Sequence, residues 1–140
     1  MKLTGSIIDI DFGDQSFFKN INELLDKLTG ERIFEYNLIR TEERVRIITE
    51  DMLNSRGVIS SLSEKCHGKV TQGLSKITIN LFYDNNNGVR QLLFNIFDIL
   101  GNYKISINNV FFTSNEIILV LDSDKATRAY DLIQKQIIKQ

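Results

Sequence analysis

The sequence predicts an α+β protein made of two ferredoxin-like units, each an antiparallel sheet with helices packed on one face. Three observations carry this prediction. Strand segments alternate apolar and polar residues, and helix segments repeat apolar residues every three or four positions. The order strand, helix, strand, strand, helix then occurs twice, and Asn20-Ile21 and Leu25 recur 75 positions later as Asn95-Ile96 and Leu100. Gly73 marks the joint, so we expect a first domain at 1–73 and a second at 74–140.

The first unit begins with the alternating strand Ile7–Phe12. An apolar stripe from Phe17 to Leu28 predicts the helix that follows, because its members are spaced as on one helix face. Two extended stretches, Arg32–Ile39 and Arg44–Thr49, flank the short charged segment Thr41-Glu42-Glu43 and should pair as a hairpin.

A second helix is expected from Met52, although Gly57 weakens that pattern. The short strand Lys69–Gln72 then ends the unit.

The second unit repeats this order with clearer signals. Its segments are a strand at Ile77–Tyr83, a helix at Val89–Leu100 stopped by Gly101, strands at Lys104–Thr113 and Glu116–Asp122, and a last helix capped by Ser123. No fourth strand follows. Either an N-terminal segment pairs there, or the chain is cut from a longer one that completed the sheet. We expect the second, because an uncovered sheet edge invites aggregation.

Composition excludes several classes of function. The 17 basic and 18 acidic residues leave a net charge of −1, which offers no broad attraction for nucleic acids or anionic lipids. No apolar run is long enough to cross a membrane, and no signal-peptide core follows Met1. The single Cys66 cannot form an intramolecular disulfide. We therefore expect a soluble, cytoplasmic protein that does not bind nucleic acid or membranes.

No constellation for catalysis is present. The sequence has no glycine-rich phosphate loop, and the neighbours Cys66 and His67 cannot supply the three or four ligands of a zinc site. No serine or threonine near His67 has a nucleophile signature. We expect no catalytic residue, no metal and no cofactor in this chain.

Two polar bends lead from a strand into a helix, at Gly13–Ser16 and Asn85–Gly88. Free backbone N–H groups at a helix start can hold a carboxylate, although each bend is also explained as a turn with capping side chains. Polar groups at Asn37, Thr41 and Glu42 are placed to meet an ammonium group. Each is equally explained as a solvated edge or hairpin residue.

The joint between the units resembles that between the two ACT domains of aspartate kinases. In those enzymes a helix runs into a short strand, and a Gly-Leu pair then leads into the first strand of the second domain. The matching residues of this chain are Ser61–Cys66 and Val70–Ile77, which contains Gly73-Leu74. Asn87-Gly88-Val89 is similar to that family's Pro-Gly-Val helix start, and Ser114–Ile117 to its Ser-Ser-Glu-Ile turn. The resemblance covers nearly all 140 residues.

The resemblance implies an effector site in the first domain, formed between subunits. Its positions correspond to Asp14, Gln15, Ser16, Phe17, Phe18, Asn37, Thr41 and Glu42. The corresponding second-unit loop comprises Asn87, Gly88, Val89, Ser114, Asn115 and Glu116.

The chain departs from the family at three of these positions, one of them Thr41, where the family has a serine. Ser16 replaces a glycine, and Asn37 replaces an aspartate that holds the effector's ammonium group. Loss of that carboxylate weakens binding by about 1.5–3 kcal/mol unless Glu42 substitutes for it.

The resemblance thus implies a regulatory region of an aspartate kinase, an ATP-dependent phosphotransferase acting on L-aspartate. Its effector would be an amino acid, lysine or threonine, in feedback control of lysine, threonine and methionine synthesis. The partners implied are a second copy, giving a homodimer through the ACT domains, and a kinase domain in the parent chain, whose Lys-Phe-Gly-Gly-Thr-Ser opening is absent from these residues. The alternative is a ligand-free dimerisation module or a stand-alone amino-acid sensor.

Overall fold

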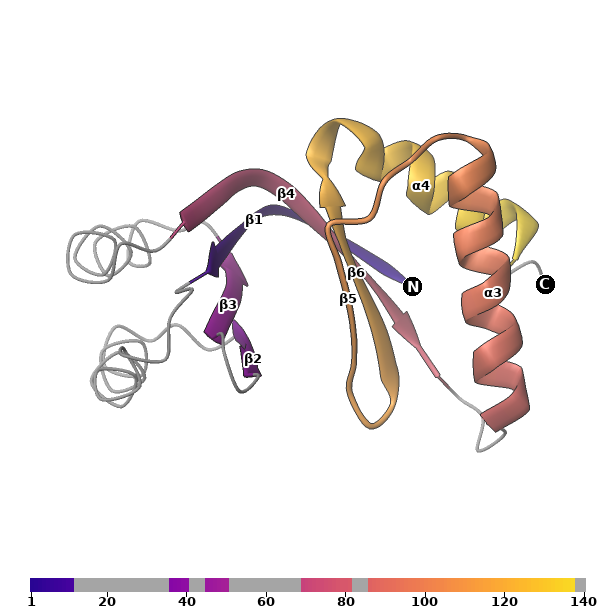
Figure 1. The fold of residues 1–140 in the computed structure, drawn as a ribbon. Helices are drawn as coiled ribbons and strands as arrows, with labels where there is room; N and C mark the ends of the chain where they lie inside the picture. The colour runs from indigo at the N-terminus through magenta and orange to yellow at the C-terminus, as the bar shows by residue number, and fades with distance from the viewer. Residues whose placement is uncertain (12–35, 41–44, 51–68, 82–85, 138–140) are drawn as a thin grey trace. The chain divides into compact units, whose positions relative to one another are not determined.

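The computed structural model describes residues 1–11, 36–40, 45–50, 69–81 and 86–137 (Figure 1). Its elements are β1 (Lys2–Asp11), β2 (Tyr36–Arg40), β3 (Val45–Glu50), β4 (Lys69–Asn80), α3 (Asn86–Asn102), β5 (Asn109–Phe112), β6 (Glu116–Asp122) and α4 (Ser123–Gln136). The helices expected from Phe17 and from Met52 lie outside the described residues.

The chain divides into two compact units. One, which we call the inserted unit, is the continuous segment Ser6–Gly73. The other, the outer unit, joins Met1–Gly5 to Leu74–Gln140. This division keeps the expected boundary after Gly73 but differs from the expected domains 1–73 and 74–140 in the first five residues.

Both units have the strand order of a ferredoxin-like fold. In the inserted unit the order is β2-β3-β1-β4, and β3 pairs antiparallel with both β2 and β1. In the outer unit it is β5-β6-β4-β1, and β6 pairs antiparallel with β4 and β5. Counting strands from the start of each repeat, both orders read 2-3-1-4, so the α+β class with two ferredoxin-like, ACT-type units is confirmed.

The fourth strand of the outer unit comes from the start of β1. The Met1 side chain packs against the outer core, and the Tyr130 hydroxyl of α4 donates a hydrogen bond to the Met1 carbonyl at 3.4 Å. The expectation that a segment missing from this chain would supply this strand was therefore wrong. The signal was missed because residues 2–5 lack the alternation that marks a half-buried strand: they are mostly exposed.

Each long strand changes unit at a residue with left-handed backbone. On β1 this residue is Ser6, with φ of 54°, and on β4 it is Gly73, with φ of 72°. The expected joint at Gly73 is thus a bend inside one continuous strand of 12 residues. Glycine adopts this conformation without the steric cost that a side chain brings, which explains its use at position 73.

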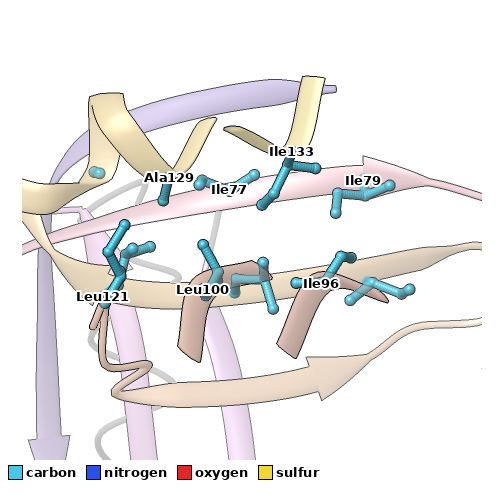
Figure 2. Close-up of a cluster of buried hydrophobic side chains, with 11 residues drawn as sticks. Ile77, Ile79, Ile96, Leu100, Leu121, Ala129 and Ile133 are labelled. Carbon is cyan, nitrogen blue, oxygen red and sulfur yellow. The ribbon is translucent and has the colours of Figure 1, made fainter. Parts of the chain in front are cut away.

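The outer unit has a core built mainly from aliphatic side chains. Figure 2 shows Ile77 and Ile79 of β4 and Leu121 of β6 meeting residues from both helices. The helix contributions include Ile96, Leu100, Ala129 and Ile133, all of them buried. Both apolar stripes predicted for these helices therefore face the core.

Helix α3 ends at Asn102, one residue beyond Gly101, the expected stop. The Lys104 N–H bonds the Gly101 carbonyl at 3.0 Å and the Ile105 N–H bonds the Leu100 carbonyl at 2.8 Å. Lys104 has a φ of 57°, so the end is a Schellman motif with lysine in the usual glycine position. Because this motif occupies residues to Ile105, β5 begins at Asn109 and not at Lys104 as expected.

Helix α4 begins where the sequence indicates, but the expected cap was wrong. Asp122 is the N-cap residue, and its side chain makes no capping hydrogen bond. Ser123 is the first helical residue, and its hydroxyl lies 2.7 Å from that of Ser75, a buried residue of β4. This pairing ties the helix start to the sheet.

No helix among the described residues is long and apolar enough to cross a membrane.

Candidate functional site

Asn37, one of the residues predicted to bind the effector, lies in β2 of the inserted unit. Its cross-strand partner is Ile48 of β3, and Ile48 pairs in turn with Asp9 of β1. Directly opposite residues of antiparallel strands point to the same face of a sheet. Asn37 therefore shares a face and a row with Asp9, and its side chain is half-buried.

The same face carries an ion pair. Arg46 of β3 donates from Nε to Asp9 Oδ1 at 3.2 Å and from Nη2 to Asp9 Oδ2. The carboxylate of Asp9 is 1% exposed, whereas the Arg46 side chain is 30% exposed. The hydrogen bond from Arg46 to Asp9 raises the pKa of the guanidinium, although partial burial opposes this. Arg46 is therefore a permanent cation with one side open to solvent.

This arrangement is suited to binding a small charged molecule. The Asn37 amide can accept a hydrogen bond from an ammonium group or donate one to a carboxylate, without itself carrying charge. The exposed part of Arg46 supplies a donor for a carboxylate. A zwitterion would thus find a group for each end on this face.

The remaining predicted first-unit residues are not placed by the structure. Asp14, Gln15, Ser16, Phe17, Phe18, Thr41 and Glu42 lie outside the described residues. Asn37 is therefore the one residue of that set whose position is established.

The predicted second-unit loop divides between two places. Asn87, Gly88 and Val89 lie in the first turn of α3, where Gly88 is exposed and Val89 packs against the outer core. Val89 is thus a packing residue and not a free loop residue.

Ser114 and Asn115 lie in the tight connection from β5 into β6, and Glu116 is the first residue of β6. The Leu81 N–H, just after β4, bonds the Asn115 carbonyl at 2.7 Å. The Thr113 hydroxyl lies 3.2 Å from Glu116 Oε1, so this carboxylate already has a local partner. Leu81 is separated from α3 by only a short segment, which brings this turn and the helix start to one end of the outer unit.

Asp9 and Arg46 were not singled out from the sequence. Asp9 stands between two isoleucines, which predicts a half-buried strand with the aspartate facing water. The missed signal was Arg46 on the neighbouring strand β3, which is placed so that its guanidinium reaches the carboxylate of Asp9. Within the described ranges no group of three or more His, Cys, Asp or Glu side chains is placed to hold a metal ion.

Comparison by sequence identifies no relative: no protein-family model and no curated protein matches the chain. Comparison by structure does. The chain is similar to the C-terminal regulatory domain of aspartate kinase from Porphyromonas gingivalis W83, with a TM-score of 0.75 at 11% identity, covering 99% of this chain and 96% of that one. It is also similar to the regulatory subunit of aspartate kinase from Thermus thermophilus, with a TM-score of 0.70 at 11% identity, covering 96% and 93%.

Whole aspartate kinases match over the same residues. For Escherichia coli aspartokinase III in complex with aspartate and ADP the TM-score is 0.76 at 13% identity, and the match covers 98% of this chain and 33% of that one. The chain therefore spans a third of the length of the whole enzyme. It has the fold of an aspartate kinase regulatory region from end to end, which confirms the resemblance at the level of the fold.

Proposed function

We propose that this chain is the allosteric, amino-acid-binding region of an aspartate kinase, with lysine or threonine as effector. Ligand binding would restrain a kinase domain that phosphorylates L-aspartate, in feedback control of lysine, threonine and methionine synthesis in the cytoplasm. An effector acts this way only through different affinities for two conformations.

The observation that carries the proposal is the match in length. The chain covers nearly all of separate regulatory domains, at 96% and 93% of their residues. One structure of aspartokinase III with this fold contains lysine and aspartate. The polar face that joins Asn37 to Asp9 and Arg46 adds chemistry that fits an amino acid.

A second candidate is a dimerisation module whose ligand site has been lost. Asn37 favours it, because an amide replaces the carboxylate that the resemblance places opposite an ammonium group. Such a module would self-associate without effector, and replacing Asn37 would leave regulation of the intact enzyme unchanged.

Thermal unfolding of the chain with lysine, threonine and methionine distinguishes the two. A specific ligand at 100 times its Kd adds about 2.7 kcal/mol to the free energy of unfolding. We expect one of the three to raise the melting temperature and the others to leave it unchanged. No shift with any of them would contradict amino-acid sensing.

Asn37→Asp tests the site itself. The restored carboxylate should tighten binding by about 10- to 100-fold if Asn37 faces the ammonium group. Asn102→Asp, at the exposed end of α3, makes the same chemical change away from the face and is the control. Equal affinity of the two variants for the effector would mean that the effector does not bind at β2.

The parent enzyme is tested separately. Sequencing the coding region on both sides of the chain should reveal a kinase domain in frame. A reading frame without one would favour the stand-alone sensor.

A further inference from the structure

The sheet of the outer unit carries a polar row on the face opposite its core. Ile77 of β4 and Leu119 of β6 belong to the core cluster. Because successive residues of a strand point to opposite faces, Lys76 and Val120 lie on the other face. The register places Lys76 opposite Val120, and Val120 opposite Asn109 of β5. These three residues therefore form one row across three strands, which we call the lysine row.

The two polar members of the lysine row have no partner. Lys76 and Asn109 are both half-buried, and neither side chain makes a hydrogen bond or an ion pair with another described residue. Val120, between them, is fully buried. Asp122, two residues further along β6, is exposed and does not pair with Lys76. A partly buried ammonium group that lacks a counter-ion has lost hydration without compensation, so the row is suited to an anion.

The inserted unit has a row in the same register with the charge reversed. There Asp9 lies opposite Ile48, and Ile48 lies opposite Asn37. The strand between them also supplies a counter-ion, because Arg46 pairs with Asp9. The position of the outer unit equivalent to Arg46, two residues before the centre of the row, is the apolar Ile118. The inserted unit thus neutralises its own charge, whereas the outer unit leaves its lysine without an equivalent partner.

We propose that the lysine row binds a small oxyanion, a carboxylate or a phosphate, between Lys76 and Asn109. Neighbouring strands lie about 4.8 Å apart, so the backbones of these two residues are separated by about 10 Å. A lysine stem can extend over apolar surface, here that of Val120, and bring its ammonium group toward the amide. Both groups can then donate hydrogen bonds to the oxygens of one anion. This site goes beyond the proposed function and involves none of the residues assigned to the effector.

An NMR titration of the full 140-residue chain tests the site. The probes are sodium succinate and sodium phosphate, with sodium chloride at matched ionic strength as the control. Succinate, phosphate or both should shift the amide resonances of Lys76, Val120 and Asn109 to saturation, and chloride should not. A response to succinate alone identifies a carboxylate ligand, and a response to phosphate alone identifies a phosphate group. No saturable shift with either probe, or the same shift with chloride, would overturn the proposal.

Matched variants test which residues hold the anion. Lys76→Gln removes the charge and should weaken binding about tenfold or more. Asn109→Ala removes a neutral donor and should weaken it about fivefold. Lys125→Gln removes the same charge at an exposed position of α4 and should leave the affinity unchanged. The NMR spectrum of each variant establishes that it is folded. Equal affinity of Lys76→Gln and Lys125→Gln for the anion would contradict the site.

The outcome is separate from that of the amino-acid titrations. Asn37→Asp should leave oxyanion binding at the lysine row unchanged, and Lys76→Gln should leave effector binding at β2 unchanged. Either proposal can therefore fail while the other holds.

Discussion

The two units share one strand order but differ in how the chain builds them. The inserted unit is one continuous segment, Ser6–Gly73, whereas the outer unit joins two segments separated by the whole of the other. Their described interiors differ as well. The polar side chain buried in the described part of the outer unit is the neutral Ser75, which pairs with Ser123, whereas the inserted unit buries the charged carboxylate of Asp9 against Arg46.

This contrast shows that strand order does not dictate what fills the interior. Hydrocarbon packing holds the outer unit together in proportion to the area removed from water. A buried ion pair adds little net stability, because desolvation of two charges offsets their attraction, but removing one partner is costly. The outer unit should therefore be most sensitive to lost hydrocarbon contacts, and the inserted unit to a buried charge that has lost its partner.

The largest effect is expected from a cavity in the outer core. Leu119 of β6 is fully buried, so Leu119→Ala should lower the free energy of unfolding by about 4 kcal/mol. Leu3→Ala, at a leucine that is 36% exposed, is the control and should cost much less. Urea unfolding measures both. Equal losses would mean that the core of the outer unit is not where the structure places it.

Breaking the ion pair should cost nearly as much in the inserted unit. Arg46→Met leaves the carboxylate of Asp9 buried without its bidentate donor and should cost about 3 kcal/mol. The double variant Asp9→Leu with Arg46→Met removes both charges and should recover much of that loss. Urea unfolding of the set gives the coupling energy. A double variant less stable than Arg46→Met alone would contradict the pairing.

The boundary between the units can be tested at Gly73. Because Gly73 has left-handed backbone, Gly73→Ala should destabilise the chain by about 1 kcal/mol, although the added methyl group meets no atom within 4 Å. Gly5→Ala is matched, since it also meets no atom but has ordinary backbone. It should be neutral or slightly stabilising. Similar melting temperatures for the two variants would contradict a left-handed backbone at Gly73 in β4.

The smallest effect is expected at the end of α3. Lys104→Gly relieves the left-handed backbone of the Schellman motif and should stabilise the outer unit by about 0.5–1 kcal/mol. Lys135→Gly, inside α4, should instead destabilise by a similar amount because glycine is a poor helix former. Differential scanning calorimetry resolves opposite shifts of this size.

The sequence was most informative where its apolar pattern is strong. The continuous apolar run within Glu116–Asp122 predicted β6 residue for residue, and this strand is buried on both faces. The apolar stripes of α3 and α4 face the core as expected. Local patterns did not reveal that Met1–Gly5 belongs to the same unit as Leu74–Gln140. Pairing between segments so far apart in the sequence leaves no periodic signal in either segment.

The candidate site was less predictable than the fold. Asn37 was named from the sequence, but its neighbours Asp9 and Arg46 were not, since their contact depends on the register between β1 and β3. Register is fixed by the sheet as a whole, and a shift of one residue would have sent either side chain to the other face. The same dependence explains why Ser123 pairs with Ser75 instead of capping its own helix.

Hydrogen exchange of the chain with and without saturating lysine, threonine or methionine tests the proposed function most directly, because it reports on each unit separately. If the inserted unit senses an amino acid, one of the three should slow exchange in β2 and β3, around Asn37 and Arg46, and leave β6 of the outer unit unchanged. Unchanged exchange in β2 and β3 with all three amino acids would contradict the account.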